Sequence, residues 1–336
     1  EDVLRELNAA IALDPANRRA HLSLGRALLA ADRHDAAIAA LRTALSLCPN
    51  EPTNGVRGEA LSLLGNACAD LGRHDEALGF FDTSSLRDPE SANILFNRAL
   101  SELHAGRYDE AWRHYERRWD VAGFSPKPVG HTLPDLKDLA GKTVLVVAEQ
   151  GMGDCFMLAR YIPLLAERGA RVVVSAYESL VSIMRTVPGV SAVIGEDEKE
   201  PPHDLAISMF SLPLVFGTRI DTVPGGMPYM SVPEANAAAW SGRLGTRSRP
   251  RVGVFWATNS GLKRKSMPLR LLRPLLESTA VEWHVLQKEV AAEDFADAVG
   301  LRIHGDTLND FADTAALIEA MNKATAMVKA MLWKCT

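Results

Sequence analysis

Residues 18–51 read RRAHLSLGRALLAADRHDAAIAALRTALSLCPNE, and this stretch decides the fold of the first third of the chain. Its small and bulky residues stand at fixed places before a helix-breaking proline: Gly25, Leu28, Ala37, Leu41, Ala44 and Pro49. Pro15 precedes Pro49 by 34 residues. A period of this length predicts a repeated pair of helices, in which small residues let the two helices approach closely and bulky residues fill the groove of the preceding pair.

Two further copies follow the first. The second begins near Gly58, after an insertion around residues 51–57, and its pattern residues are Gly65, Ala77, Phe81, Ser84 and Pro89. The third begins at Ala92 and runs into Trp119, and its pattern residues are Ala99, Gly106, Tyr108, Ala111 and Tyr115. The pattern resembles the tetratricopeptide repeat (TPR) family. This resemblance implies an α-solenoid over residues 1–120, about a third of the chain.

A stack of such helix pairs presents a concave surface that suits a peptide or a helix of a partner protein. Asn66 and Asn97 lie on first helices of their pairs and would contact a peptide backbone there. The same repeats would equally serve only to support the domain that follows. The pattern leaves both interpretations open: a protein or peptide partner in the concave groove, or structural support.

The composition excludes several classes of protein. A net charge of −5 over 336 residues gives no global reason to expect nucleic acid or a membrane surface as partner. No run of 18 apolar residues occurs, so no membrane span is expected. The four cysteines show no C-x-x-C spacing and the nine histidines show no metal-ligand spacing. We therefore expect a cytoplasmic protein without a bound metal or other cofactor.

The pattern changes after residues 121–140, which carry three prolines and two glycines and are expected to form a linker. A first α/β domain is expected over residues 141–240. Its predicted strands lie at 143–148, 171–175, 192–194 and 204–208, and its predicted helices at 155–168 and 178–187. Continuous β-branched runs such as TVLVVA favour strands that are buried on both faces of a parallel sheet.

A second α/β domain is expected over residues 241–336, after a basic interdomain link at 241–251. Its predicted strands lie at 251–256, 282–286 and 301–304, and its predicted helices at 269–277 and 291–299. The fold class is therefore α + α/β, a TPR solenoid followed by two Rossmann-like parallel-sheet units. Two such units would face each other across a cleft, with ligands outside the carboxyl ends of the strands.

The loop EQGMGD at residues 149–154 follows the first predicted strand. Gln150, Gly151 and Gly153 are candidates for a loop that binds an acceptor or a phosphate, because backbone N–H groups and the positive end of a helix would face the ligand there. Phe156 occupies the place of the third glycine in the dinucleotide fingerprint, which argues against a nicotinamide or flavin cofactor. A tight strand-to-helix turn without any ligand explains the two glycines as well.

Four segments together resemble a known family. They are EQGMGD, FMLARYIPLLAERGARVVV (156–174), SLPLVFGT (211–218) and GVFWATN (253–259). The region from 92 to about 320 is similar to bacterial proteins in which TPR repeats precede a glycosyltransferase-like region of GT-B type. That region resembles the heptosyltransferases and, more distantly, the O-linked N-acetylglucosamine transferases. The resemblance implies transfer of a sugar from a nucleotide-sugar donor to a hydroxyl acceptor.

Asp154 is the catalytic residue that this resemblance implies. In heptosyltransferase-like enzymes the Gly-Asp after the first strand supplies a candidate general base, which would take the proton from the acceptor hydroxyl. The alternative is that Asp154 only satisfies backbone donors and the dipole at the start of a helix.

The donor site that the resemblance implies lies in the second α/β domain. The segment from Lys265 and Ser266 to Pro268 matches the family's Lys-x-Trp-Pro, with Met in the place of the aromatic residue. Lys265, helped by Lys263 and Arg264, would neutralise the departing diphosphate. Such a run of charge on an exposed loop would otherwise be solvated and have no ligand.

The ends of two predicted strands add further donor-site candidates. Trp256 and Asn259 end one strand and Gln287 and Lys288 end the next, so all four would line the cleft. Trp256 would equally suit the protein core, and the same alternative applies to Gln287 and Lys288.

The chain departs from the family after residues 311–321. Relatives continue with a buried strand, whereas residues 322–336 read NKATAMVKAMLWKCT, with loose helical spacing. We therefore expect about three strands in the second sheet and an incomplete donor site. Two hypotheses result: a glycosyltransferase-like protein whose repeats bind the acceptor or a partner, and a non-catalytic TPR scaffold with a degenerate glycosyltransferase-like module.

Overall fold

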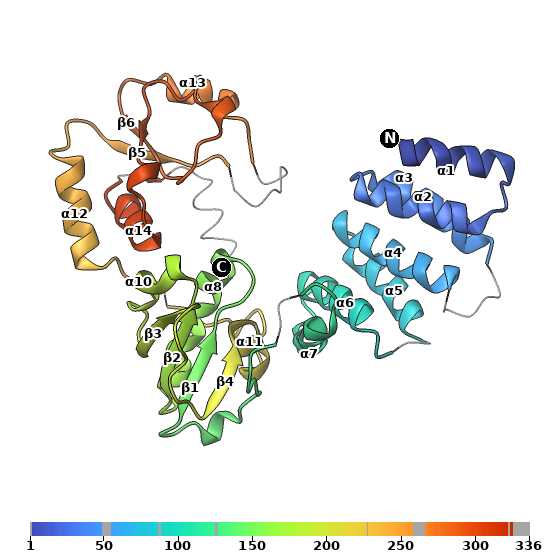
Figure 1. The fold of residues 1–336 in the computed structure, drawn as a ribbon, viewed down its shortest axis with the longest axis horizontal. Coiled ribbons are helices and arrows are strands. Elements are labelled where there is room, and N and C mark those ends of the chain that lie inside the picture. The colour runs from blue at the N-terminus through green and yellow to red at the C-terminus, as the bar shows by residue number, and fades with distance from the viewer. Residues whose placement is uncertain are drawn as a thin grey trace. The chain divides into compact units, whose positions relative to one another are not determined.

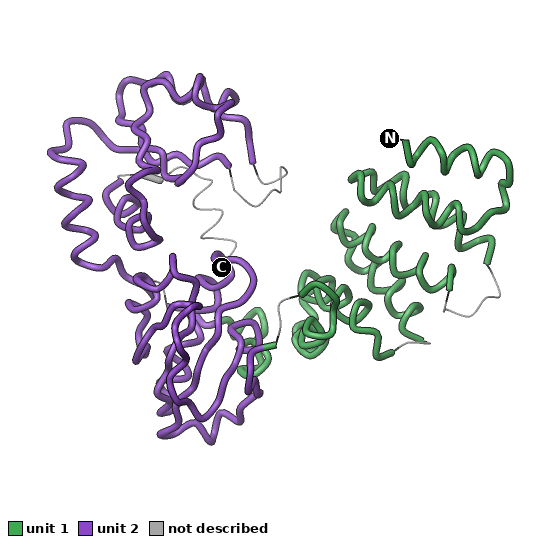
Figure 2. Tube along the Cα trace, in the orientation of Figure 1, with its two compact units in different colours: residues 1–127, 213–223 green, residues 128–212, 224–336 purple. Residues whose placement is uncertain are grey.

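The computed structural model describes most of the chain (Figure 1). The described ranges are 2–48, 55–86, 89–124, 127–226, 228–257, 266–321 and 323–324. The chain forms two compact units (Figure 2). The first contains Glu1–Lys127 and Pro213–Val223, and the second contains Pro128–Leu212 and Pro224–Thr336.

The first unit is built from helices. They are α1 (Asp2–Leu13), α2 (Arg18–Ala30), α3 (His34–Ser46), α4 (Val56–Asp70), α5 (His74–Ser85), α6 (Ala92–His104) and α7 (Tyr108–Tyr115), followed by the 3-10 turn η1 (Glu116–Asp120). Consecutive helices pack on one another in the pairs α2 with α3, α4 with α5 and α6 with α7. The expected helical repeats are confirmed.

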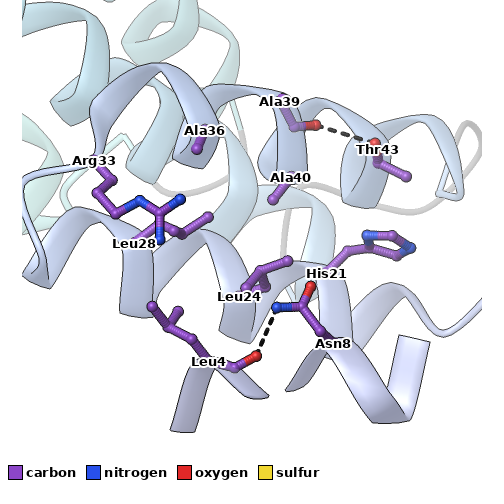
Figure 3. A pocket seen from close by; sticks show the side chains of 10 residues that line it. All are labelled: Leu4, Asn8, His21, Leu24, Leu28, Arg33, Ala36, Ala39, Ala40 and Thr43. Atoms are coloured by element: carbon purple, nitrogen blue, oxygen red, sulfur yellow. Dashed lines mark hydrogen bonds between the residues drawn. The ribbon is translucent and has the colours of Figure 1, made fainter. Parts of the chain in front are cut away.

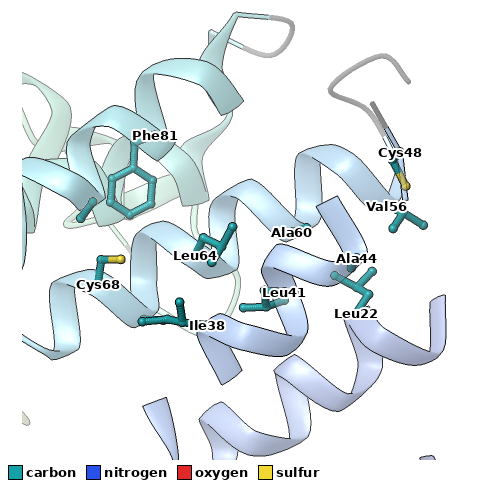
Figure 4. Close-up of a cluster of buried hydrophobic side chains, with 12 residues drawn as sticks. Leu22, Ile38, Leu41, Ala44, Cys48, Val56, Ala60, Leu64, Cys68 and Phe81 are labelled. Carbon is teal, nitrogen blue, oxygen red and sulfur yellow. The ribbon is translucent and has the colours of Figure 1, made fainter. Parts of the chain in front are cut away.

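Close contact between a small and a bulky residue explains the repeated pattern. A Cβ atom on Gly25 would lie 2.5 Å from the side chain of Leu41, and one on Gly65 would lie 2.5 Å from the ring of Phe81. Leu41 and Phe81 are fully buried in one apolar cluster that extends from α2 to α5 (Figure 4). The glycines are therefore required by packing, because any side chain at these places would overlap the neighbouring helix.

The second unit contains two parallel sheets. The first consists of β1 (Thr143–Val147), β2 (Arg171–Ala176), β3 (Val190–Gly195) and β4 (Leu205–Ser208), in the order β3-β2-β1-β4. Its central strand β1 pairs with β2 and β4, and Val144, Leu145 and Val146 are fully buried. The continuous apolar run of β1 thus fills the middle of a sheet, as a strand buried on both faces requires.

Short helices follow three strands of the first sheet. Those between β1 and β2 are α8 (Met152–Leu158), η3 (Ala159–Tyr161) and α9 (Ile162–Ala166), and those between β2 and β3 are η4 (Glu178–Leu180) and α10 (Val181–Met184). After β4 come η5 (Met209–Ser211) and α11 (Leu212–Val215), and α11 extends into the segment Pro213–Val223 of the first unit. The prediction of a single helix at 155–168 is wrong in detail, because the helical segment begins at Met152 and consists of α8, η3 and α9. Pro163 stands in the first turn of α9 and has no N–H to continue the preceding helix.

The second sheet consists of β5 (Arg251–Val254), β6 (Glu282–Val285), β7 (Arg302–Ile303) and β8 (Lys323–Ala324), in the order β7-β6-β5-β8. All its pairs are parallel. The other elements of this part are α12 (Glu234–Leu244), η7 (Leu269–Leu272), α13 (Arg273–Leu276), η8 (Ala292–Asp294), η9 (Gly305–Thr307) and α14 (Phe311–Glu319). The fold class is α + α/β, as expected.

Three details of the second sheet differ from expectation. The predicted helix at 291–299 is only the turn η8, because Asp294 accepts hydrogen bonds from Trp256 and Leu269 and holds the chain there. The predicted link does not begin at residue 241, since α12 extends to Leu244. The sheet has four described strands where about three were expected. The additional strand is β8, whose backbone pairs with the edge of β5, although the sequence around β8 has loose helical spacing. Backbone pairing at a sheet edge prevails here over a weak helical pattern.

Within the described ranges, no helix combines the length and the apolar character that crossing a lipid bilayer requires.

Candidate functional site

A groove on the first unit crosses α1, α2 and α3 (Figure 3). Its volume is about 370 Å³. The residues that line it are Leu4, Asn8, His21, Leu24, Leu28, Arg33, Ala36, Ala39, Ala40 and Thr43. Asn66 and Asn97, which the sequence suggested as peptide contacts, lie on α4 and α6 and do not line this groove.

The groove has an apolar floor and a polar rim. Leu4 and Leu28 are buried, and Leu24 packs against them. On the rim, Asn8 donates a hydrogen bond of 2.7 Å to the carbonyl of Leu4, and Thr43 donates one of 3.0 Å to the carbonyl of Ala39. Such a groove would take an apolar side chain and offer hydrogen-bonding groups to the backbone beside it.

The turn after β1 holds the candidates that were predicted there. Gln150 has a positive φ of 62°, and its carbonyl accepts a hydrogen bond of 2.7 Å from the hydroxyl of Tyr177. The carboxylate of Asp154 accepts one of 3.1 Å from the backbone N–H of Gly151. A Cβ atom on Gly153 would meet nothing within 4 Å. The structure therefore brings Gln150, Gly151, Gly153 and Asp154 into one turn, in which Asp154 caps α8.

Glu149 directly precedes Gln150 in this turn and was not singled out from the sequence. It is 5% exposed, and its carboxylate accepts hydrogen bonds from the hydroxyl of Ser208 and, at 2.9 Å, from the amide of Gln150. The neighbouring thiol of Cys155 is buried, and burial together with the negative charges of Asp154 and Glu149 raises its pKa to about 12. Cys155 therefore stays protonated and is unsuited to act as a nucleophile.

Trp256 and Gln287 meet at the ends of β5 and β6. Trp256 is fully buried, and its indole N–H donates a hydrogen bond of 2.8 Å to the carboxylate of Asp294. Oε1 of Gln287 accepts bonds from the backbone N–H groups of Trp256 and Ala257 at 3.2 and 3.3 Å. Of the two interpretations of Trp256, the structure favours the core. Gln287 joins the ends of two strands.

The other donor-site candidates lie on the loops beyond these strand ends. Lys288 is exposed, and Ser266 is half-buried. Asn259, Lys263, Arg264 and Lys265 lie outside the described residues. Their role at a donor diphosphate therefore stays a prediction.

The described residues include no group of three or more His, Cys, Asp or Glu side chains placed to hold a metal ion. The expectation that the protein works without a metal remains a prediction.

Comparison with known proteins identifies the helical part. Models of the tetratricopeptide repeat match residues 17–85 and 81–123. Protein FlbA of Caulobacter vibrioides is 27% identical over 297 residues, which are 75% of this chain and 48% of FlbA. The chain thus spans about half the length of this curated relative.

Two solved structures are more distant. The crystal structure of MamA matches 35% of this chain and 66% of its own, with 21% identity and a TM-score of 0.32. A Thermobaculum terrenum O-GlcNAc transferase mutant matches 81% of this chain and 68% of its own, with 13% identity and a TM-score of 0.28. The family models, together with the helix pairs described above, show that residues 17–123 of this chain are tetratricopeptide repeats.

Proposed function

We propose that the repeats bind a segment of a partner protein in the groove across α1, α2 and α3. The observation that carries this proposal is the combination of a leucine floor with a hydrogen-bonding rim on an array of TPR helices. Stacked helical repeats present extended surfaces of this kind, and their partners are usually proteins or peptides.

The lining also suggests what the partner segment contains. A volume of about 370 Å³ over Leu4, Leu24 and Leu28 suits one or two apolar side chains. The guanidinium of Arg33 at the same groove would favour an acidic residue beside them. The expected partner is therefore a short apolar segment with an acidic flank.

A displayed library of random peptides tests this proposal on the full chain. Selected peptides should carry an apolar anchor, and Ala39→Arg, which places a long cation on the exposed rim, should weaken their binding about tenfold or more, as loss of one anchor contact does. Ala12→Arg is the matched control, since Ala12 is exposed on α1 but does not line the groove. Equal affinity of the two variants for the selected peptides would contradict the proposed site.

A second candidate function is sugar transfer by the α/β region. It is supported by the turn at the carboxyl end of β1, where Gly151 and Gly153 are exposed beside Asp154 and a Cβ atom on Gly153 would meet open space. In this proposal Asp154 takes the proton of the acceptor hydroxyl, and the Lys265 segment neutralises the diphosphate of a nucleotide-sugar donor. The alternative is a non-catalytic scaffold, in which Asp154 only caps α8.

Thermal unfolding with a panel of nucleotide diphosphate sugars separates these alternatives. A donor at one hundred times its dissociation constant would stabilise the folded protein by about 2.7 kcal/mol. Asp154→Asn should keep that shift and abolish transfer, whereas Lys265→Ala should remove most of the shift. Asp197→Asn, an exposed position in the same unit, should change neither. Absence of a shift with every sugar would refute an intact donor site.

A further inference from the structure

The first helix of each TPR pair ends in the same turn. The residue two places after α2, α4 and α6 has a positive φ: 58° at Asp32, 73° at Gly72 and 77° at Gly106. Its N–H bonds to the carbonyl three residues back, and the next N–H bonds to the carbonyl five residues back, as in Gly72 to Ala69 at 2.9 Å and Arg73 to Cys68 at 2.8 Å. This is the left-handed helix end that satisfies the last carbonyls of a helix.

An arginine of this turn bridges to the preceding pair of helices. Arg73 lies 3.4 Å from the carboxylate of Asp35, and Arg107 lies 3.1 Å from that of Asp75. Asp35 and Asp75 are the second residues of α3 and α5. The second residue of α7 is Asp109. A following repeat would therefore be expected to bring an arginine to Asp109.

That arginine is Arg219, which comes from the segment between the two sheets. Arg219 donates hydrogen bonds of 2.9 and 2.5 Å to the two carboxylate oxygens of Asp109. It comes after a turn like those of the repeats: Gly217 has a φ of 58°, its N–H bonds to Leu214 at 3.1 Å, and the N–H of Thr218 bonds to Pro213 at 2.9 Å. Residues 213–223 accordingly belong to the same compact unit as the repeats (Figure 2).

The segment differs from a repeat beyond this turn. In the repeats, the carbonyls of Arg73 and Arg107 accept the first hydrogen bond of the next helix. The carbonyl of Thr218 instead accepts a bond of 3.0 Å from the indole N–H of Trp112 on α7, and Thr218 is only 3% exposed. Arg219 also stands one residue later than the arginines of the repeats. The segment thus copies the end of a first helix and its turn, without a second helix.

We infer that residues 213–223 act as a partial fourth repeat that caps the TPR array at α7. Trp112 is the fifth residue of α7, the place that the buried Leu78 occupies on α5. The last pair of an array needs a cover for this face, and terminal units of helical repeats serve that purpose. Here the cover comes from residues 213–223, about a hundred residues further along the chain. Asp109 and Trp112 are its docking residues.

Hydrogen exchange of the full chain, followed by mass spectrometry, tests the cap. Arg219→Asp should accelerate exchange of the amides in α7 and in 213–223 by about 1.5- to 5-fold, the range expected for loss of an exposed ion pair. Asp109→Arg alone should do the same. The double variant Asp109→Arg/Arg219→Asp restores opposite charges and should recover the original protection. Trp112→Phe, which keeps an aromatic ring but loses the N–H donor, should also accelerate exchange in 213–223.

Matched variants make the result decisive. Arg113→Asp changes an exposed charge on the same helix and should leave 213–223 unaffected. Arg107→Asp breaks the equivalent bridge inside the array and should accelerate exchange in α5 by a similar factor. The inference is overturned if Arg219→Asp behaves like Arg113→Asp, or if the double variant exchanges as fast as either single variant.

Discussion

The TPR helices and the strand ends of the second sheet are held together by opposite means. Between α2 and α5, glycine meets leucine or phenylalanine in an apolar cluster, and ion pairs such as Arg42 with Glu76 stay on the surface. At the ends of β5 and β6, a buried tryptophan and glutamine are bonded to other polar groups. The comparison teaches that shape complementarity organises the repeats, whereas satisfied buried polar groups organise the strand ends.

Among the variants considered, Phe81→Ala in the TPR helices should lower the free energy of unfolding most. Phe81 is fully buried over Gly65, and its truncation leaves a cavity that fixed helix backbones cannot fill. The free energy of unfolding should fall by about 3–5 kcal/mol, to be measured by urea denaturation with far-UV circular dichroism. A cost below about 1 kcal/mol would show that the array relaxes around the cavity and is not tightly interlocked.

Acidification should destabilise the second sheet, where His284 is fully buried. Nδ1 of His284 lies 2.9 Å from Nε2 of His304. Burial, then the positive charges of His304, Arg302 and Arg251, lower the pKa of His284 to about 4, against the opposing effect of Glu282. As pH falls below 6.5, the unfolded chain therefore binds a proton at this histidine before the folded chain does. The free energy of unfolding should fall by about 3 kcal/mol by pH 4.

Hydrogen exchange shows which elements of the chain lose stability on acidification. Between pH 6.5 and 4, after correction for intrinsic rates, protection should fall more in β6 than in α5. His284→Asn removes the titrating group and should flatten much of the pH dependence in β6. If the variant retains the full dependence, another group is responsible for it.

Gly65→Ala and Gly153→Ala should change the free energy of unfolding least, and in opposite directions. A Cβ atom at Gly65 overlaps the ring of Phe81, so overpacking should cost about 1–3 kcal/mol. At Gly153 a Cβ atom meets open space within the first turn of α8, so alanine should stabilise by about 0.4–1 kcal/mol. Urea denaturation of both variants measures the difference, and a destabilising Gly153→Ala would show that the turn needs glycine.

The sequence predicted the repeats well because each pattern residue acts within its own or the next helix pair. The turn after β1 was also predicted, since a strand, two glycines and a helix start lie next to each other in the chain. Glu149 was missed because a single acid at a strand end gives no local sign of its burial against Ser208. The short helices and β8 were misjudged because Pro163, Asp294 and the edge of β5 act through contacts that spacing does not encode.

The sequence by itself determined the helix pairs, the parallel strands and the class of the fold, since periodicity and β-branched runs express how each segment buries its own apolar face. Only the tertiary structure decided that Trp256 belongs to the core and that residues 213–223 join the repeats. The bond from Arg219 to Asp109 spans 110 residues. A contact over such a separation depends on where folding brings two surfaces together, and no local pattern records it.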